Sequence, residues 1–297
     1  MHLVRFFRLV RLALWRALGH DAFGVAKGAA FSSILSLFPA LLVVASVAAA
    51  SRKTSVVEEI SRVMARVLPP GTEQTAQVYF TRATDRPVGV LVATSLLTLW
   101  ISSGVMISWM EGFRNAYQLP KVWGMVKERF IAFGLVIMAG IPLTAATLLV
   151  VFGNEIERWA IYHVGHGFGP YILMLWTAIR WLIAILTSIA VMLLIYHHAV
   201  PRTQPWHSVL PGSALATAVW FPATVFFGWY VRHFAKYSLL YGSLATAVVL
   251  LIWMYIISVI VLIGAEFNAL LYPRLAAVPP ERDVEESNPR IKVGHGA

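Results

Sequence analysis

Apolar residues run along the chain in six long stretches, separated by shorter segments that hold most of its charges. The stretches cover residues 25–50, 88–110, 128–153, 171–199, 207–231 and 243–270. Each is near the ~20 residues that an α-helix needs to cross the hydrocarbon core of a bilayer. None shows the sustained alternation of apolar and polar residues that marks a membrane β-barrel strand. The pattern predicts an all-α membrane protein with six transmembrane helices.

The composition excludes a soluble globular protein. Hydrophobic residues make up 59% of the 297 residues and charged residues only 13%, and the mean hydropathy is +0.72. A soluble domain carries about 25% charged residues. Because the apolar stretches are spread over the chain, we expect one polytopic domain at 21–272 rather than a soluble domain with an anchor. There is no cysteine, so disulfides, thiolate metal sites and a cysteine nucleophile are excluded.

Three segments outside the spans have patterns of their own. In residues 1–20, four arginines fall at helical spacing among large apolar side chains, which predicts an amphipathic basic helix on the inner leaflet. In the loop 51–86, Ser55 and Glu58 have the spacing of a capping box, and "LPPG" ends the stretch. We expect two short amphipathic helices there, on the outer face. The polar, proline-containing stretch 273–297 is expected to be a disordered cytoplasmic tail.

Basic residues set the expected orientation. With the N-terminus inside, the inner segments hold fourteen lysines and arginines and the outer segments nine, of which six lie in the loop 51–86. Cytoplasmic loops of membrane proteins carry the excess of these residues. Both termini are therefore predicted to be cytoplasmic. The formal net charge of +10 then indicates contact with anionic lipid head groups, with no nucleic acid as partner.

Polar and kinking residues inside the spans are the candidates for function. Pro39, Pro142 and Pro222 each lie within a predicted span, where a proline frees a backbone carbonyl and bends the helix. They are either packing kinks or the sign of a bundle around a cavity. Arg180 lies about a third of the way into the fourth span, where a charge costs about 2.5–3.5 kcal/mol at the helix centre. We expect it to face the interior, bonded to a freed carbonyl or to an anionic group.

A second group of polar residues falls at the inner ends of the spans. Its members are Asp21, Lys27, Glu111, Arg114, Asn115, Glu266 and Asn268. Lys27 is the expected partner of Glu266, because the first span begins where the sixth one ends. Two interpretations remain open: an ion-pair network that fixes helix ends, and a gate or ligand site at the cytoplasmic mouth.

Known catalytic motifs are missing from the chain. There is no phosphate-binding P-loop, no G-x-S-x-G turn and no H-E-x-x-H helix. The pairs His163 with His166 and His197 with His198 lack the carboxylate or third ligand of a metal site. The sequence therefore predicts no catalytic residue, no metal and no cofactor.

Several motifs resemble those of the YihY/BrkB family of bacterial inner-membrane proteins, across about residues 20–272. In "AAFSSILSLFPALLVV", the residues Phe31, Ser36, Leu37 and Pro39 match its first-span motif, although Ser32 and Ser33 replace a bulkier pair. "FRNAY" at 113–117 and "VPRTQPWHSVLPGSALATAVWF" also resemble family elements, with Ser213 in place of the usual alanine. The closing stretch is the most specific and matches at Tyr241, Gly242, Ser243, Leu244, Trp253, Tyr255, Gly264, Ala265, Glu266 and Asn268.

This resemblance implies six helices in a bacterial inner membrane, without established catalytic residues. Some members have carried the label ribonuclease BN, one branch is associated with virulence, and others are tied to lipid or lipopolysaccharide traffic. Together with the residues above, it leads us to expect transport of an anionic amphiphile, a lipid or a small solute. An assembly or envelope-integrity factor is the alternative, since small-residue runs such as "ASVAAAS" favour a homo-oligomer. A membrane-bound ribonuclease is the weakest alternative.

Overall fold

The structure, a computed structural model, describes residues 2–50, 88–164, 169–201, 204–234 and 243–273. These ranges contain seven α-helices and no strand. The helices are α1 (His2–Gly19), α2 (Ala22–Ala50), α5 (Val88–Tyr117), α6 (Met125–Val164), α7 (Gly169–His198), α8 (Trp206–Phe234) and α10 (Ser243–Leu271). The all-α prediction is confirmed, and each of the six long helices overlaps one predicted span. The predicted outer-loop helices and all but the first residue of the predicted tail lie outside the described residues.

Five of these helices contain an apolar segment long enough to cross a membrane. The segments are Gly89–Tyr117, Met125–Ala146, Leu175–His198, Trp206–Val231 and Ala247–Leu271. In α2 the apolar stretch found is shorter, at Ala22–Leu37. Large apolar side chains such as Leu96, Leu182 and Val225 are exposed on the helix surfaces. Such surfaces suit contact with lipid rather than with water.

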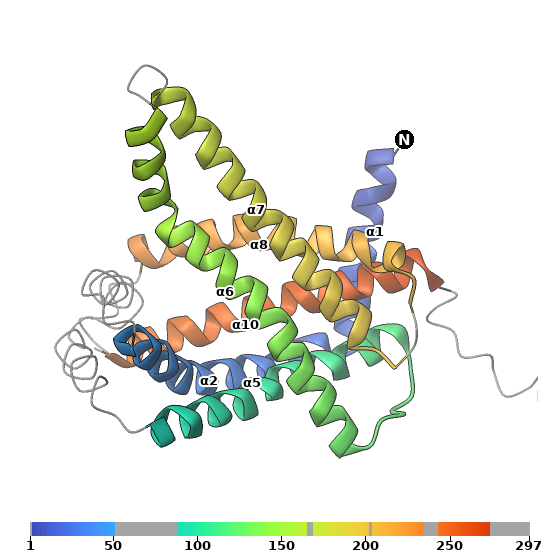
Figure 1. The fold of residues 1–297 in the computed structure, drawn as a ribbon. Coiled ribbons are helices and arrows are strands. Elements are labelled where there is room, and N and C mark those ends of the chain that lie inside the picture. The colour runs from blue at the N-terminus through green and yellow to red at the C-terminus, as the bar shows by residue number, and fades with distance from the viewer. Residues whose placement is uncertain (1, 51–87, 165–168, 202–203, 235–242, 274–297) are drawn as a thin grey trace, which may run out of the picture.

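The helices share one end, at which α1 lies. In Figure 1, α1 (pale blue, below the mark N) crosses near the end of α10, against which it packs, whereas the longer helices run away from it. Within the bundle, α2 packs most extensively against α5, and α10 packs against α8, α2 and α5. The α6–α7 pair runs obliquely to the others (Figure 1). We refer to this shared end, which the sequence predicts to be cytoplasmic, as the α1 end.

A sharp turn at Asp21 joins α1 to α2. Asp21 has a φ of 55°, a left-handed conformation that Asp adopts more readily than most residues. Its carbonyl accepts the first hydrogen bond of α2, from the backbone N–H of Val25 at 3.1 Å. Its carboxylate lies so close to Gly24 that a Cβ there would be 2.4 Å from Oδ1. A Cβ at residue 24 would therefore displace the exposed, flexible side chain of Asp21 from this position.

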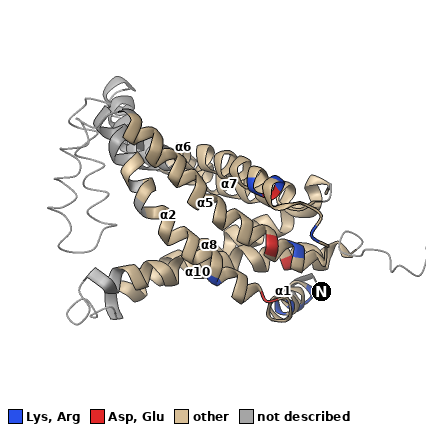
Figure 2. Cartoon of the chain, turned by 90° about the horizontal axis from the view of Figure 1, so that it is seen from below, with Lys and Arg blue, Asp and Glu red and all other residues tan. Residues whose placement is uncertain are grey.

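Packing is tightest near the α1 end and loosens away from it. In α10, Leu262, Ala265 and Ala269 are buried, whereas Val248 and Ile252 are exposed. In α7 and α8, buried residues are likewise more frequent toward the α1 end, although Trp206 and Leu210 at the start of α8 are exposed. Figure 2 shows that most charged residues among those that the structure describes also lie toward this end. The described core therefore holds the helices together at one end of the bundle.

The three prolines that the sequence places within transmembrane spans lie inside helices in the structure. Pro39 is buried in α2, Pro142 is half-buried in α6, and Pro222 is exposed in α8. A further proline, Pro211, lies in the second turn of α8 and was missing from the predicted set. The prediction that the three bend their helices stays a prediction.

Candidate functional site

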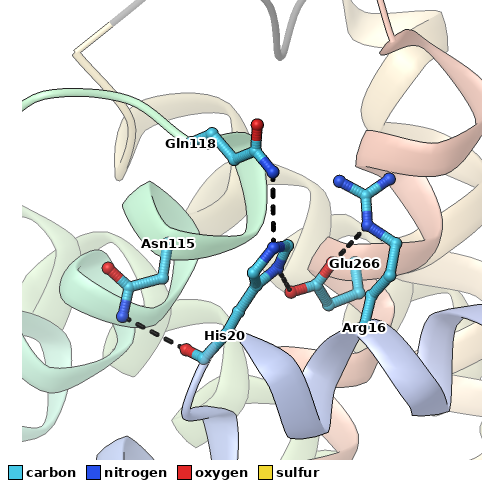
Figure 3. Close-up of polar contacts among 5 residues, drawn as sticks. All are labelled: Arg16, His20, Asn115, Gln118 and Glu266. Atoms are coloured by element: carbon cyan, nitrogen blue, oxygen red, sulfur yellow. Dashed lines mark hydrogen bonds and ion pairs between the residues drawn. The ribbon is translucent and has the colours of Figure 1, made fainter.

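Glu266 is the centre of a polar network at the α1 end. Its side chain is 1% exposed, and it lies on α10 one turn before the helix ends. Nδ1 of His20 is 2.6 Å from its Oε1, and Nε of Arg16 is 3.7 Å from its Oε2. Both partners come from α1 and the turn that follows it (Figure 3). A buried carboxylate requires such partners, because desolvation disfavours its charged form.

The contacts of His20 extend this network to α5. The side-chain amide of Gln118 lies 3.4 Å from Nε2 of His20, and Nδ2 of Asn115 donates to its backbone carbonyl at 3.3 Å. Because a carboxylate only accepts hydrogen bonds, Nδ1 of His20 is the donor to Glu266. Nε2 of the neutral ring is then free to accept from Gln118. One histidine thus joins α1, α5 and α10 (Figure 3).

Lys27 is not the partner of Glu266, and that expectation was wrong. Lys27 is exposed on α2, and within the described part of the chain Glu266 forms an ion pair with Arg16 and a hydrogen bond with His20. Lys27 lies at the same level of the bundle as Glu266, but it is on the exposed face of α2 and so does not reach that carboxylate. Asn115 joins the network as predicted from its level, whereas Arg16, His20 and Gln118 were missed. One feature of the sequence could have indicated His20: "GHD" at 19–21 follows the amphipathic helix and lies at the same level of the bundle as Glu266.

Asn268 has a different role, which is to brace α8 against α10. Its Oδ1 accepts a hydrogen bond from the backbone N–H of Gly212 at 2.6 Å, and its Nδ2 donates to the carbonyl of Val209 at 3.1 Å. Pro211 has no N–H, so the helix is short of one backbone bond at this point. The amide of Asn268 therefore supports the first turns of α8.

A close helix crossing lies beside this brace. A Cβ on Gly212 would be 2.2 Å from the carbonyl oxygen of Gly264, and a Cβ on Gly264 would be 2.3 Å from the hydroxyl of Tyr196. That hydroxyl donates to the carbonyl of Val261 at 2.6 Å. Small residues allow helix backbones to approach in this way. The most specific motifs of the sequence thus meet at one crossing of α7, α8 and α10.

Arg114 belongs to a second ion pair, on the other side of α5. It bonds to Glu128, near the start of α6, and both side chains are buried. Nζ of Lys121 lies 3.4 Å from the other oxygen of Glu128. The pair closes the connection between α5 and α6. Glu111 and Asp21 of the predicted group are exposed and lie apart from both networks.

Arg180 lies farther from the α1 end, on α7. It is half-buried and its Nε is covered by protein, whereas its neighbours Trp181 and Leu182 are exposed. At helical spacing, Ala184 and Ser188 continue the face of α7 that carries Arg180. Arg180 therefore lies on the less exposed, inward stripe of α7. Its expected bond to a freed carbonyl or an anionic group stays a prediction.

A cavity opens next to that stripe. Its volume is about 320 Å³, and it is bounded by five helices, α5, α6, α7, α8 and α10. The residues that line it are Trp109, Leu143, Ser188, Val191, Met192, Ala216, Thr217, Trp220, Ile257, Ile260 and Val261. None of them carries a charge. Ser188 is eight residues from Arg180, about 12 Å along the helix.

The described residues contain no group of three or more His, Cys, Asp or Glu side chains placed to hold a metal ion. The polar networks at the α1 end instead consist of carboxylates paired with basic side chains. The candidate site of this protein is therefore the cavity together with the inward stripe of α7, and the networks hold the helices that form its walls.

Comparison with known proteins gives the family. The profile described as "Virulence factor BrkB" matches residues 13–288. The ribonuclease-like protein YfkH of Bacillus subtilis is 28% identical over 256 residues, which is 86% of this chain and 92% of that protein. A UPF0761 membrane protein of Tolumonas auensis is 28% identical over 86% of this chain and 83% of its own length. A longer relative from Chlorobium phaeobacteroides is 27% identical, and the match covers 58% of it. No solved structure matches the chain. Since the profile spans nearly all of the described helices, the protein is a multi-pass membrane protein of the virulence factor BrkB, or UPF0761 (YihY), family.

Proposed function

We propose that the protein binds an anionic amphiphile within the membrane and moves it across a bacterial inner membrane. The observation that carries this proposal is the uncharged cavity of about 320 Å³ between five helices. A pocket for a small molecule has a volume of about 300–1,000 Å³ and mostly apolar walls. The cavity can hold part of an acyl chain, and its position within the apolar spans puts it at membrane depth.

The charges of the bundle suit the anionic part of such a molecule. At the α1 end, Arg5, Arg8 and Arg11 are exposed on α1. If this end is cytoplasmic, they lie at the surface of the leaflet that carries anionic lipids, which attract basic residues. Arg180 provides a second positive charge, on the same face of α7 as the cavity-lining Ser188 and farther from the α1 end. An anionic head group would thus meet positive charge on both sides of the cavity.

The burial gradient supports movement at one end of the bundle. The helices are tightly packed near the α1 end, where His20, Asn268 and Arg114 join them, and their outer surfaces are more exposed beyond the cavity. Motions that open and close a bundle come from its less stable parts. We assign the α1 end the role of a fixed base and the described parts of α7 and α8 beyond the cavity the role of a moving part.

Cleavage of RNA, which the name of the Bacillus subtilis relative suggests, is not part of this proposal. The two buried carboxylates at the α1 end, Glu266 and Glu128, are engaged by basic partners, and the described residues gather no metal-binding group. The test is direct: the purified protein is incubated with RNA and Mg²⁺, alongside Glu266→Gln. Cleavage by the wild type that disappears in the variant would make the protein an enzyme.

The proposed function is tested by reconstitution in liposomes. Fluorescent phosphatidylglycerol is placed in the inner leaflet, and its appearance in the outer leaflet is followed with a membrane-impermeant quencher. Faster movement than in empty liposomes, and faster than for a zwitterionic lipid with the same chains, supports the proposal. Equal rates with and without protein, across lipids and small organic anions, would overturn it.

A further inference from the structure

Arg129 reaches from the start of α6 across to α5. Its Nη1 donates to the hydroxyl oxygen of Ser103 at 2.8 Å, and its Cζ lies over the ring of Trp100, 4.7 Å from the ring centroid. The hydroxyl of Ser103 is itself fixed, because it donates to the carbonyl of Trp100 at 2.6 Å. A cation over the face of a tryptophan is attracted by the ring. The two contacts therefore hold the guanidinium in one orientation between the two helices.

The charge of Arg129 has no carboxylate partner in the part of the chain that the structure describes. The neighbouring acid, Glu128, is already engaged by Arg114 and Lys121. A guanidinium has five N–H donors, of which Ser103 takes one. Arg129 is half-buried, and its Nε and Nη2, which have no partner among the described residues, are open to the surface of the bundle. The charge therefore lacks a counter-charge but can be reached from outside.

The side chains around this charge are those of a lipid-facing surface. Trp100 is 57% exposed and Phe130 is 68% exposed. Phe133 packs against both, with its ring centroid 6.0 Å from that of Trp100 and 6.1 Å from that of Phe130. Arg129 is near the beginning of the apolar segment Met125–Ala146, so its backbone lies near one edge of the membrane. A charge held against lipid is costly unless an anion or water meets it.

The free edge of the guanidinium has the geometry that binds a phosphate. The N–H groups of Nε and Nη2 lie on one edge of the guanidinium and point in nearly the same direction. Such an edge forms paired hydrogen bonds with two oxygens of a carboxylate or a phosphate. Ser103 occupies Nη1 and leaves this edge of Arg129 unused. At the edge of a bilayer the abundant anion is the lipid phosphate, and exposed aromatic rings offer apolar area to the chains of the same lipid.

We infer that this surface between α5 and α6, made of Arg129 and the three rings beside it, binds an anionic phospholipid. The phosphate bonds to Nε and Nη2 of Arg129, and the chains lie along the rings of Trp100, Phe130 and Phe133. An anionic lipid fits better than a zwitterionic one, because its head group brings no cation to repel the guanidinium. None of these residues lines the cavity, so the Arg129 site does not rest on the proposed function.

The test measures how much the phosphate adds to lipid binding. Phosphatidylglycerol, or the diacylglycerol with the same chains and no phosphate, is titrated onto the purified full-length protein, and the bound fraction is measured by native mass spectrometry. The readout is the ratio of the two affinities. Arg129→Gln removes the charge and is expected to lower this ratio about tenfold, near the low end of the range for a hydrogen bond to a charged group. A ratio equal to that of the wild type would overturn the inference.

A matched control separates the site from general attraction to basic residues. Lys127→Gln removes one exposed charge from the same turn of α6, about 200° around the helix from Arg129, and should leave the ratio nearly unchanged. Because each ratio is taken within one variant, a lower yield of folded protein does not mimic the effect. A loss with Lys127→Gln as large as with Arg129→Gln would reveal unspecific attraction and overturn the site.

Variants of Trp100 test the role of the ring. Trp100→Leu removes the face over which the guanidinium lies and should lower the ratio about two- to fivefold, the range for an exposed cation–π contact. Trp100→Phe keeps a ring and should retain most of the ratio. Equal ratios for Trp100→Leu and the wild type would show that the ring does not position Arg129 and would overturn the site as described.

Inorganic phosphate tests whether the ligand is a lipid. The wild-type ratio should persist in excess inorganic phosphate, because the free ion gains nothing from the aromatic rings. A ratio that phosphate abolishes, and that chloride at the same ionic strength does not, would indicate a general anion site and overturn the lipid assignment. The result is separable from the proposed function: an Arg129-dependent ratio without lipid movement in liposomes contradicts transport alone, and movement with a ratio that Arg129→Gln leaves unchanged contradicts the Arg129 site alone.

Discussion

Nδ1 of His20 donates to Oε1 of Glu266 across 2.6 Å, between residues that are 246 positions apart in the chain. The bond ties the end of α1 to α10. A second contact lies farther along α1, where the rings of Phe6 and Phe267 are 5.9 Å apart at 67°. The amphipathic helix is therefore attached to the bundle mainly through one short stretch of α10, with further contacts to α2 and α5. Its apolar residues Phe7 and Trp15 stay exposed for contact with lipid.

Replacing His20 is expected to destabilise the protein. His20→Ala removes the short hydrogen bond and leaves Glu266 buried with Arg16 alone, which should cost about 1.5–3 kcal/mol, the range for a bond to a charged group. The melting temperature in detergent would fall. Adding Glu266→Gln should recover part of the loss, because the uncompensated charge is gone. Lys27→Ala, on the exposed face of α2, is the control; a fall as large as that of His20→Ala would contradict the assigned partners.

Gly212→Ala should prevent normal packing of α8 on α10. The new Cβ would lie 2.2 Å from the carbonyl oxygen of Gly264, and a backbone atom cannot move away as a flexible side chain can. Overpacking of this kind costs about 1–3 kcal/mol or more. Gly134→Ala, on the exposed side of α6 with nothing within 4 Å, is the matched control. Comparable yields of folded protein for the two variants would show that the helices do not cross at Gly212.

Glu128→Gln is expected to lower stability more than Glu111→Gln. Glu128 is buried against Arg114, so its neutral isostere leaves a buried guanidinium without its charge partner. Breaking a buried pair in this way costs about 3–5 kcal/mol. Glu111 is exposed, and its variant should melt close to the wild type. The comparison is made by thermal melting, and identical curves for the two variants would exclude the Arg114 pair as a structural bond.

Arg180→Leu is expected to keep the fold and abolish lipid movement. The cost of a charge at this depth disappears in the variant, so its stability should be equal to or above that of the wild type. Lipid movement in liposomes should fall to the level of empty liposomes if Arg180 attracts the anionic head group. Arg180→Lys, which keeps the charge, should retain part of the rate. Loss of folding in Arg180→Leu would instead show that the arginine supports the architecture.

The helices were predictable because local sequence determines them in this chain. Long apolar stretches must form helices in lipid, where every backbone polar group needs a partner within the segment. The same argument placed Arg180 on an inward stripe. It also placed Glu266, Asn115 and Lys27 at one level of the bundle, because span ends align at the interface.

The partners within that level were not predictable. Whether Glu266 meets Lys27 or His20 depends on the rotation of each helix about its axis, which the long, nearly uniformly apolar spans leave undetermined. The cavity depends on the angles at which α6 and α7 cross the other helices. These crossing angles cannot be predicted from the pattern of residues in a single sequence. Asn268 bonds to the α8 backbone beside Pro211, and the place of this proline in a family motif does not indicate that contact.

Lipid movement after filling the cavity tests the central claim most directly. Ile257→Trp adds a large side chain to the cavity wall, whereas Ile252→Trp adds the same group to the exposed face of the same helix. Both proteins are reconstituted at equal density, and the movement of phosphatidylglycerol between leaflets is measured. The account predicts that Ile257→Trp reduces the rate at least tenfold, about 1.4 kcal/mol, and that Ile252→Trp leaves it unchanged. Equal rates for two folded variants would contradict the claim that the amphiphile passes through this cavity.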